Sequence, residues 1–108
     1  MGVVMNVGGV VKFANPRAAE LVNVQVGGCA RAGDVNTEAR EHVSALLEAE
    51  GVARDIETKL RGPDGEIRDV LGTHLTMNYE GESGELSWLT DISKLKVVEA
   101  EILRAKDL

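Results

Sequence analysis

Apolar residues dominate the first thirteen positions of the chain, where Gly8 and Gly9 separate two β-branched runs. A Gly-Gly pair tolerates the positive φ angles of a tight turn, so residues 2–13 predict a β-hairpin. The period of the pattern then changes at Asn15 and Pro16. Asparagine is a preferred N-cap and proline is tolerated at the first helical position, so a short helix is predicted to start at Pro16.

Residues 26–34 carry three glycines and show no clear period, so they predict a loop or a broken helix. Asn36 then supplies a second N-cap, and Glu38 places an acid in the first turn, where the helix dipole favours it. A second helix is expected from there to about Glu50, and Gly51 ends it. Its apolar residues recur at helical spacing and form one stripe, which consists of Ala39, Val43, Leu46 and Leu47.

Three strands are predicted in the second half of the chain. Apolar and charged residues alternate from residue 56 to 61, which is typical of a strand with one solvated face. Gly-Pro-Asp-Gly at 62–65 predicts a turn, residues 67–79 a long strand, residues 80–84 a second turn and residues 86–90 the last strand. The last strand then runs into helical sequence without a glycine or proline between them. Two strands, two helices and three strands give an α+β order.

The composition of the 108 residues narrows the classes of function. A net charge of −6 argues against binding to nucleic acid or to an anionic membrane, because such surfaces concentrate Lys and Arg. A single cysteine cannot form an intrachain disulfide, and no apolar run approaches the ~20 residues of a membrane span. We therefore expect a cytoplasmic segment with no nucleic-acid partner and no direct membrane contact.

Patterns typical of catalysis are missing from the sequence. It has no phosphate-binding glycine loop at a helix start, no Cys/His cluster with metal-ligand spacing, and no Ser/His/Asp or Cys/His set in a plausible order. We expect a domain that is not an enzyme, with no catalytic residue and no metal.

Three segments of the chain resemble motifs of PAS domains, the sensory modules of bacterial signalling proteins. Residues 10–21 resemble the second strand and first helix of that family, and Gly-Pro-Asp-Gly at 62–65 resembles its hairpin after the third strand. Residues 90–96, Thr-Asp-Ile-Ser-Lys-Leu-Lys, resemble the family's Asp-Ile-Thr signature with its downstream basic residue. The resemblance implies a PAS domain over residues 1–93 and the start of a signalling helix or coiled-coil linker over residues 94–108.

The resemblance also implies a fold. It is the α+β PAS fold, a five-stranded antiparallel sheet in the order 2-1-5-4-3 with short helices over one face and a ligand-sized pocket between them. In that fold the last strand passes directly into the signalling helix. Asp91 is then expected to accept from backbone amides of the helix start and to lie near Lys96, while Ile92 fills the junction and Ser93 caps the helix. The alternative is an ordinary N-cap formed by Asp91 and Ser93.

Apolar residues in the terminal helical segment recur at spacings of three, four and three. Such spacing is an a/d seam, which would pair with a second copy of itself, and its members are Leu95, Val98, Ile102 and Ala105. Two heptads are too short to establish a coiled coil. A single amphipathic helix folded back on its own sheet is the alternative.

The register of the last strand in the family places Ser87 and Leu89 in the pocket and Trp88 on the outer face of the sheet. An outward tryptophan predicts a dimer interface or a covering helix. In the preceding strand, Gly72 and His74 share one face, and the pattern leaves open whether that face is inside. An exposed histidine is the commoner case, but a buried His74 would have room beside Gly72 for a small polar ligand.

Two residues could suggest a cofactor. The haem-binding branch of the family takes its iron ligand from a helix in the region of His42, but its local pattern is more specific than Glu-His-Val-Ser at 41–44. Cys29 lacks the polar and aromatic surroundings of the photoactive flavin branch, and we expect a small buried thiol there. The sequence therefore predicts no cofactor.

The resemblance implies a sensory and dimerisation domain from a longer signalling protein. Such a domain relays a signal through its C-terminal helix to an effector further along the same chain. Residues 100–108 resemble the linker of sensor histidine kinases, so the expected effector is a histidine kinase in a two-component phosphorelay. The alternatives are a diguanylate cyclase and a stand-alone module that binds a small ligand. The sequence names no ligand.

Overall fold

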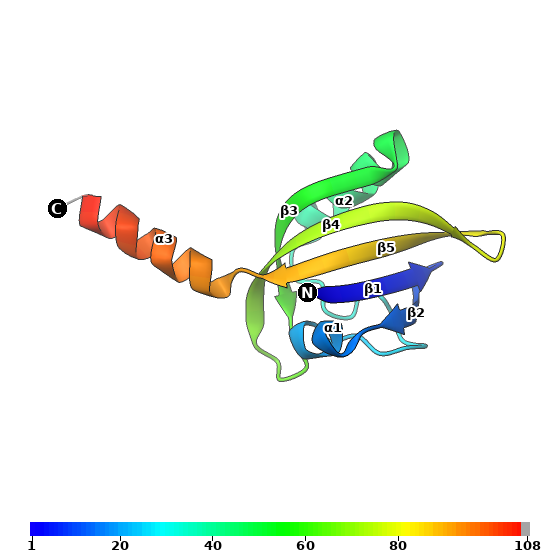
Figure 1. Cartoon of the computed structure of the whole chain (residues 1–108), viewed down its shortest axis with the longest axis horizontal. Helices are drawn as coiled ribbons and strands as arrows, with labels where there is room; N and C mark the ends of the chain where they lie inside the picture. Colours follow the sequence, from blue (N-terminus) through cyan, green and yellow to red (C-terminus); the bar gives the residue numbers. More distant parts are fainter. Residues whose placement is uncertain (107–108) are drawn as a thin grey trace.

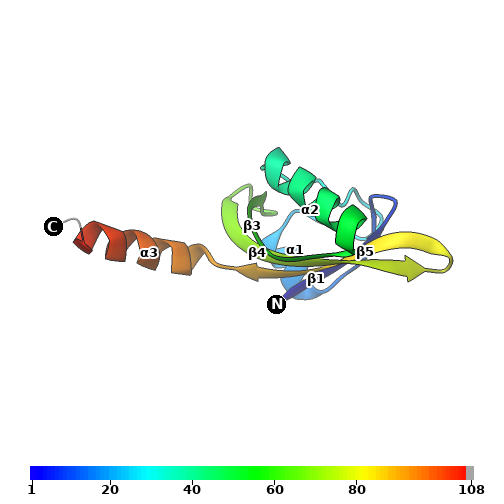
Figure 2. The same ribbon diagram turned by 90° about the horizontal axis from the view of Figure 1, so that it is seen from above.

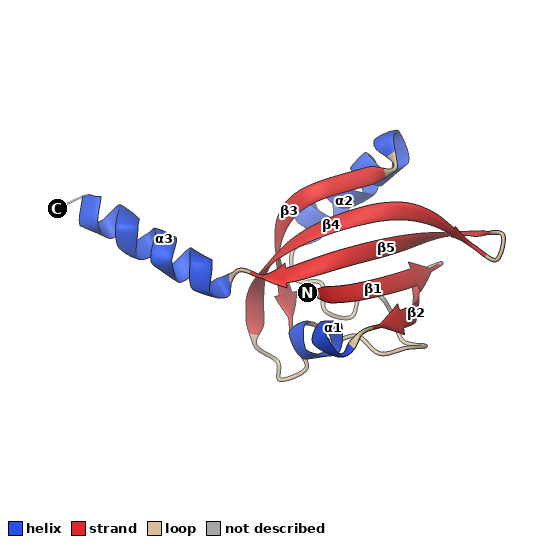
Figure 3. Cartoon of the chain, viewed as in Figure 1, coloured by secondary structure: helices blue, strands red, loops and turns tan. Residues whose placement is uncertain are grey.

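The computed structural model describes the chain from residue 1 to 106, with side chains up to residue 104. Two strands and two helices come first, then three strands and a terminal helix (Figures 1 and 3). The elements are β1 (Gly2–Val7), β2 (Val10–Ala14), α1 (Pro16–Leu21), α2 (Thr37–Glu50), β3 (Val52–Arg61), β4 (Ile67–Tyr79), β5 (Glu82–Asp91) and α3 (Ser93–Lys106).

The five strands form one antiparallel sheet in the order β2-β1-β5-β4-β3. This confirms the α+β class and the strand order that the sequence resemblance implies. The last strand, β5, lies in the centre of the sheet between β1 and β4 (Figure 1). The helix that follows it is therefore attached to the middle of the sheet.

Two strands are longer than the sequence pattern predicts. β3 begins at Val52, because Gly51 ends α2 at φ 76° and leads straight into the sheet. A bulge between Ala53 and Ile56, with Asp55 at φ 53°, interrupts the alternation of side chains, so the sequence pattern does not detect the first residues of the strand. β5 begins at Glu82, since the turn before it is only two residues long.

The helices α1 and α2 share one side of the sheet, here called the inner face. Figure 2 shows α2 lying over this face. α1 packs against β1 at Gly2, where an added Cβ would lie 3.0 Å from Cα of Ala18. Only glycine lets the helix backbone approach the strand so closely.

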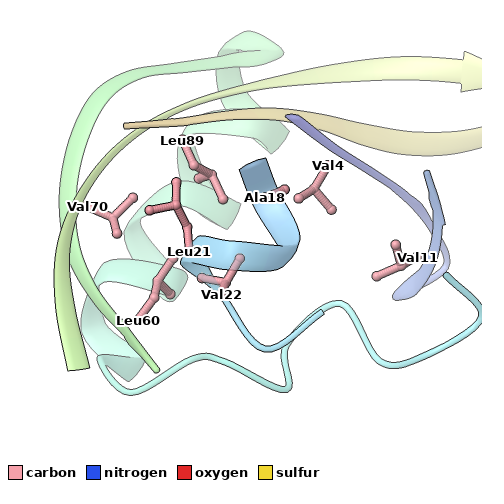
Figure 4. Packing of buried hydrophobic residues seen from close by; sticks show 8 residues of the cluster. All are labelled: Val4, Val11, Ala18, Leu21, Val22, Leu60, Val70 and Leu89. Carbon is pink, nitrogen blue, oxygen red and sulfur yellow. The ribbon is translucent and has the colours of Figure 1, made fainter. Parts of the chain in front are cut away.

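The hydrophobic core lies between the inner face and α1 (Figure 4). Leu21 of α1 is almost fully buried and lies among side chains from β3, β4 and β5. The core cluster consists of Val4, Val11, Ala18, Leu21, Val22, Leu60, Val70 and Leu89. Burial of such side chains contributes about 1.5–3 kcal/mol each.

The opposite side of the sheet, the outer face, is apolar and has no cover from the described helices. Cross-strand partners share a face, and Met5, Leu86 and Leu75 are partners across three strands. Val3 and Trp88 form a second pair beside them. We call these five residues the outer apolar face.

α3 does not fold back on the sheet, so that alternative is wrong. The helix projects away from the body of the domain (Figures 1 and 2), and with the helix included the greatest dimension is 57 Å. Within the described residues, its contacts with the sheet lie near its first turn, beside β4 and β3.

Candidate functional site

A cavity of about 80 Å³ lies on the inner face, between the sheet, α2 and the loop that precedes α2. One wall is apolar and includes Val4, Val22 and Leu89. Ser87, Leu89 and His74, the three residues that the sequence suggests for a pocket, all line it. His74 is only 9 % exposed, so the expectation of an exposed histidine is wrong.

The other wall is a network of polar side chains centred on Glu85 of β5. Arg40 of α2 donates two hydrogen bonds to its carboxylate, from Nη2 to Oε1 at 2.7 Å and from Nη1 to Oε2 at 3.1 Å. Ser87 donates to Oε2 at 3.1 Å, and Nδ1 of His74 lies 3.2 Å from the same oxygen. The network ties α2 to the centre of the sheet.

This network determines which nitrogen of His74 carries the proton. Ser87 has one hydroxyl proton and donates it to Glu85. Ser87 can therefore only accept from His74, whose Nδ1 lies 2.8 Å from its Oγ. Nδ1 of His74 is then the protonated nitrogen. Nε2 makes no hydrogen bond to any of the residues whose side chains the structure describes.

The same contacts set the charges in the cavity. Burial alone would raise the pKa of Glu85, but hydrogen bonds from His74 and Arg40, together with the charge of Arg40, hold it well below its usual range. The hydrogen bonds to Glu85 raise the pKa of Arg40. Burial raises the pKa of Asp34, which lies near Arg40. Glu85 and Arg40 therefore form a charged pair.

Sequence patterns missed both members of this pair. Glu85 falls between the turn predicted at residues 80–84 and the strand predicted at residues 86–90, although it alternates with Ser87 and Leu89 on one face of β5. Arg40 is next to the apolar stripe of α2, where an arginine normally reaches solvent. Only the approach of α2 to β5 gives it a buried partner 45 residues away.

His42 and Cys29, the two candidate cofactor residues of the sequence analysis, lie outside the cavity. His42 is exposed on α2 and does not line the cavity. Cys29 is exposed, so the prediction of a buried thiol is wrong. The backbone of its loop pairs with β2, through a bridge between Cys29 and Val10, and this leaves the thiol at the surface.

The junction between β5 and α3 is held by hydrogen bonds to β4. Oδ1 of Asp91 accepts from the amide of Ser93 at 2.9 Å. The side chain of Ile92 fills the junction and is only 8 % exposed. The amide of Ile92 donates to the carbonyl of Asp69 at 2.9 Å. Ser93 is not the cap, because it is the first helical residue and its hydroxyl accepts from the amide of Asp69 at 3.2 Å.

The expected proximity of Asp91 and Lys96 is also wrong. Nζ of Lys96 lies 2.7 Å from Oε2 of Glu57 on β3 and 3.6 Å from Glu99. Asp91 instead turns back toward the amide of Ser93. Burial would raise the pKa of Asp91, but the hydrogen bonds from Ser93 outweigh it and lower the pKa.

The side chains that the sequence assigns to pairing are exposed on α3. Leu95, Val98 and Ile102 are 53 %, 48 % and 51 % exposed, and the side chain of Ala105 lies outside the described residues. Val97 and Leu103, which the seam does not include, are exposed as well. Trp88 is half-buried within the outer apolar face.

Within residues 1–106, no group of His, Cys, Asp and Glu side chains is placed to hold a metal ion. None of the described helices combines the length and the apolar character needed to cross a membrane.

Comparison with known proteins gives the fold a family name. No protein-family model and no curated protein matches the chain. Among solved structures it is similar to a PAS domain from Colwellia psychrerythraea, with 20 % identity, 86 % of each chain covered and a TM-score of 0.71.

Two similar structures come from Burkholderia thailandensis. One is the PAS domain, in complex with ethanol, of a transcriptional regulator in the LuxR family; it shares 17 % identity over 85 % of this chain and 88 % of that one, with a TM-score of 0.67. The other is a sensory box histidine kinase/response regulator, with 14 % identity, 98 % and 87 % covered, and a TM-score of 0.70. The chain therefore has the PAS fold.

Proposed function

We propose that the chain is a sensory and dimerisation domain that relays a state of its cavity to an effector through α3. The observation that carries the proposal is the course of β5. Ser87 and Leu89 line the cavity, and the same strand continues through Asp91 and Ile92 into α3. A displacement of β5 at the cavity therefore changes the direction in which the helix leaves the sheet.

Dimerisation is supported by the exposure of α3. Its 14 residues are close to the shortest length at which an isolated helix is marginally stable in water. About half of the surface of Leu95, Val98 and Ile102 is in solvent. Pairing with a second copy would bury this seam and stabilise the helix. The outer apolar face offers a second surface to the same partner.

The effector is proposed to be a histidine kinase of a two-component phosphorelay, with a diguanylate cyclase as the alternative. Residues 100–108 resemble a kinase linker, and one similar structure belongs to a sensory box histidine kinase/response regulator. The domain itself would be regulatory and have no catalytic residue. A stand-alone module that binds a small ligand is the remaining alternative, and it does not require α3 to pair.

Sedimentation velocity tests the pairing of α3. The chain should sediment as a dimer at high micromolar concentration, and Ile102→Ser should weaken the dimer by at least about tenfold because it removes an apolar side chain from the seam. Glu101→Ala, one residue away and outside the seam, is the matched control and should leave the dimer unchanged. A strict monomer at these concentrations would rule out dimerisation and favour the stand-alone module.

A further inference from the structure

Two hydrogen-bonding atoms of the cavity are left without a partner in the described part of the chain. Nε of Arg40 is buried, and no oxygen accepts its hydrogen. In the neutral imidazole, Nε2 of His74 carries a lone pair, since the proton is on Nδ1. A buried donor that makes no hydrogen bond is costly, so a ligand that accepts from Nε of Arg40 would be favoured in this cavity. One atom offers a donor and the other an acceptor.

The two atoms belong to neighbouring side chains. Nη1 of Arg40 and Nδ1 of His74 both approach Oε2 of Glu85, at 3.1 Å and 3.2 Å. Nε2, at the far side of the imidazole ring, lies over Gly72, where an added Cβ would be only 2.8 Å away. Glycine at this position lets the imidazole ring of His74 lie against the strand.

The charges of the cavity disfavour an ionic ligand. The guanidinium of Arg40 already forms an ion pair with the carboxylate of Glu85. Asp34 and Arg31 add one acidic and one basic side chain to the lining of the cavity. An anion would meet Glu85, and a cation would meet Arg40. Either would also lose its hydration against the apolar wall without a counter-ion of its own.

The size of the cavity restricts the ligand further. At about 80 Å³ it is well below the several hundred Å³ of pockets for drug-sized molecules, so it suits a molecule of a few heavy atoms. The apolar wall, which includes Val4, Val22 and Leu89, would contact the carbon part of such a molecule.

We propose that the cavity binds a small uncharged molecule that carries a hydrogen-bond acceptor and a donor side by side, as a primary amide does. The acceptor takes the hydrogen of Nε of Arg40, and the donor gives its hydrogen to Nε2 of His74. This ligand class rests on the sensory function proposed above and specifies it. Arg40 connects the ligand to α2, and His74 connects it through Ser87 to β5.

Three probes of equal size and different charge test the ligand class. Acetamide is neutral, acetate is an anion and acetamidinium is a cation, and each is titrated into the chain at pH 7.5 while imidazole ¹⁵N and backbone NMR signals are recorded. So small a probe is expected to bind with a dissociation constant in the millimolar range. Acetamide should give saturable shifts at His74 and Ser87 and bind about tenfold more tightly than either ion. Equal or tighter binding of an ion, or no saturable shift with acetamide, would overturn the proposal.

Two variants locate the probe. His74→Asn retains a donor toward Ser87 and Glu85 but lacks the acceptor at Nε2, and it should weaken acetamide binding by about tenfold or more. Gly72→Ala should do the same, because its Cβ would displace the imidazole ring that carries Nε2. Thr90→Ala, on the outer face of β5, is the control and should bind as the unchanged chain does. Unweakened binding in both cavity variants would place acetamide elsewhere and contradict the proposal.

The probe experiment and the pairing experiment can fail separately. Acetamide binding depends on the inner face and not on α3. A chain that binds acetamide but stays monomeric would remove the proposed relay and keep the ligand class. A chain that dimerises but prefers acetate would overturn the ligand class and keep the proposed relay.

Discussion

Glu85 is the residue on which the polar side chains of the cavity converge. Its carboxylate accepts from Arg40 and Ser87 and lies beside His74, although the residue is only 9 % exposed. A buried charge is tolerated only when it is paired and hydrogen-bonded. The network therefore stabilises one arrangement of α2 against the sheet, and it penalises the loss of any member.

The lowered pKa of Glu85 predicts a pH dependence of stability. Its pKa is lower in the folded state than in the unfolded state, so ionised Glu85 stabilises the fold above about pH 4.5. This contribution is lost as the pH falls through the folded-state pKa. Glu85→Gln should lower the free energy of unfolding by about 2 kcal/mol at pH 7 and flatten its decline below pH 5.

Urea unfolding followed by the fluorescence of Trp88 measures this effect at several pH values. The exposed residue Glu82 provides a control, because Glu82→Gln should follow the unchanged chain throughout. The raised pKa of Asp34 has the opposite effect on the pH dependence of stability. Subtracting the stability curve of Glu85→Gln from that of the unchanged chain therefore isolates the contribution of Glu85. Parallel curves for Glu85→Gln and the unchanged chain would show that the carboxylate is not held by the network.

At the scale of elements, β5 and α3 form one continuous unit. The junction is held by two hydrogen bonds to Asp69 on β4, whose carbonyl accepts from the amide of Ile92 and whose amide donates to the hydroxyl of Ser93. The ion pair between Lys96 and Glu57 on β3 adds a third contact. Beyond Lys96 the helix extends into solvent. A few contacts therefore determine its direction, and a change of 1–3 kcal/mol, which is typical of allosteric coupling, can select between two directions.

Replacing Asp91 should alter the helix more than the fold. Asp91→Ala removes the acceptor of the Ser93 amide, and losing such a cap costs roughly 1 kcal/mol, so the melting temperature should fall by less than about 8 °C. The direction of α3 should change, seen as a shifted distance between nitroxides attached at residue 101 of the two copies in a Cys29→Ser background. In the longer signalling protein proposed above, output should become insensitive to the stimulus.

Asp91→Asn separates capping from charge at the same position. Its amide oxygen can still accept from Ser93, so it should behave as the unchanged chain if capping is the role of Asp91. Behaviour like Asp91→Ala would assign the effect to the charge. If Asp91→Ala left both the distance and the signalling output unchanged, Asp91 would be an ordinary cap without a part in the relay.

At the scale of the whole molecule, two apolar surfaces have no partner within residues 1–104. One is the seam of α3 and the other is the outer apolar face, which lies on the side of the sheet opposite α1 and α2. Both are continuous with β5, because Leu86 and Trp88 lie on its outer side and α3 follows its end. A second copy of the chain that covers both surfaces would respond to any displacement of β5.

Trp88→Ala should weaken this dimer more than it destabilises the monomer. Trp88 is half-buried in a single chain, so its truncation there removes only part of a large aromatic contact. In a dimer that uses the outer apolar face, the same truncation removes the part that the partner covers. Sedimentation velocity and thermal unfolding at low concentration measure the two effects. A larger loss in monomer stability than in dimer affinity would place Trp88 outside the interface.

Local patterns in the sequence were sufficient for the order and type of the elements. Asn15 and Asn36 cap α1 and α2, Gly51 ends α2 with a positive φ, and the Gly8-Gly9 turn joins β1 to β2. Each of these signals acts within a few residues, because capping and turn conformation depend on local backbone angles and hydrogen bonds. The boundaries of β3 and β5 were missed where a bulge or a charged strand end broke the alternation.

Only the tertiary structure decided which side chains meet. The sequence by itself gave His74 two possible faces, but the pairing of β4 with β5 places it beside Ser87 on the inner one. Arg40 and Glu85 meet because α2 packs over β3 and β4, next to β5, and Lys96 reaches Glu57 because α3 leaves beside β3. The physical reason is that the period of a strand or helix determines which residues share a face. Which neighbour that face meets depends on how distant parts of the chain pack together.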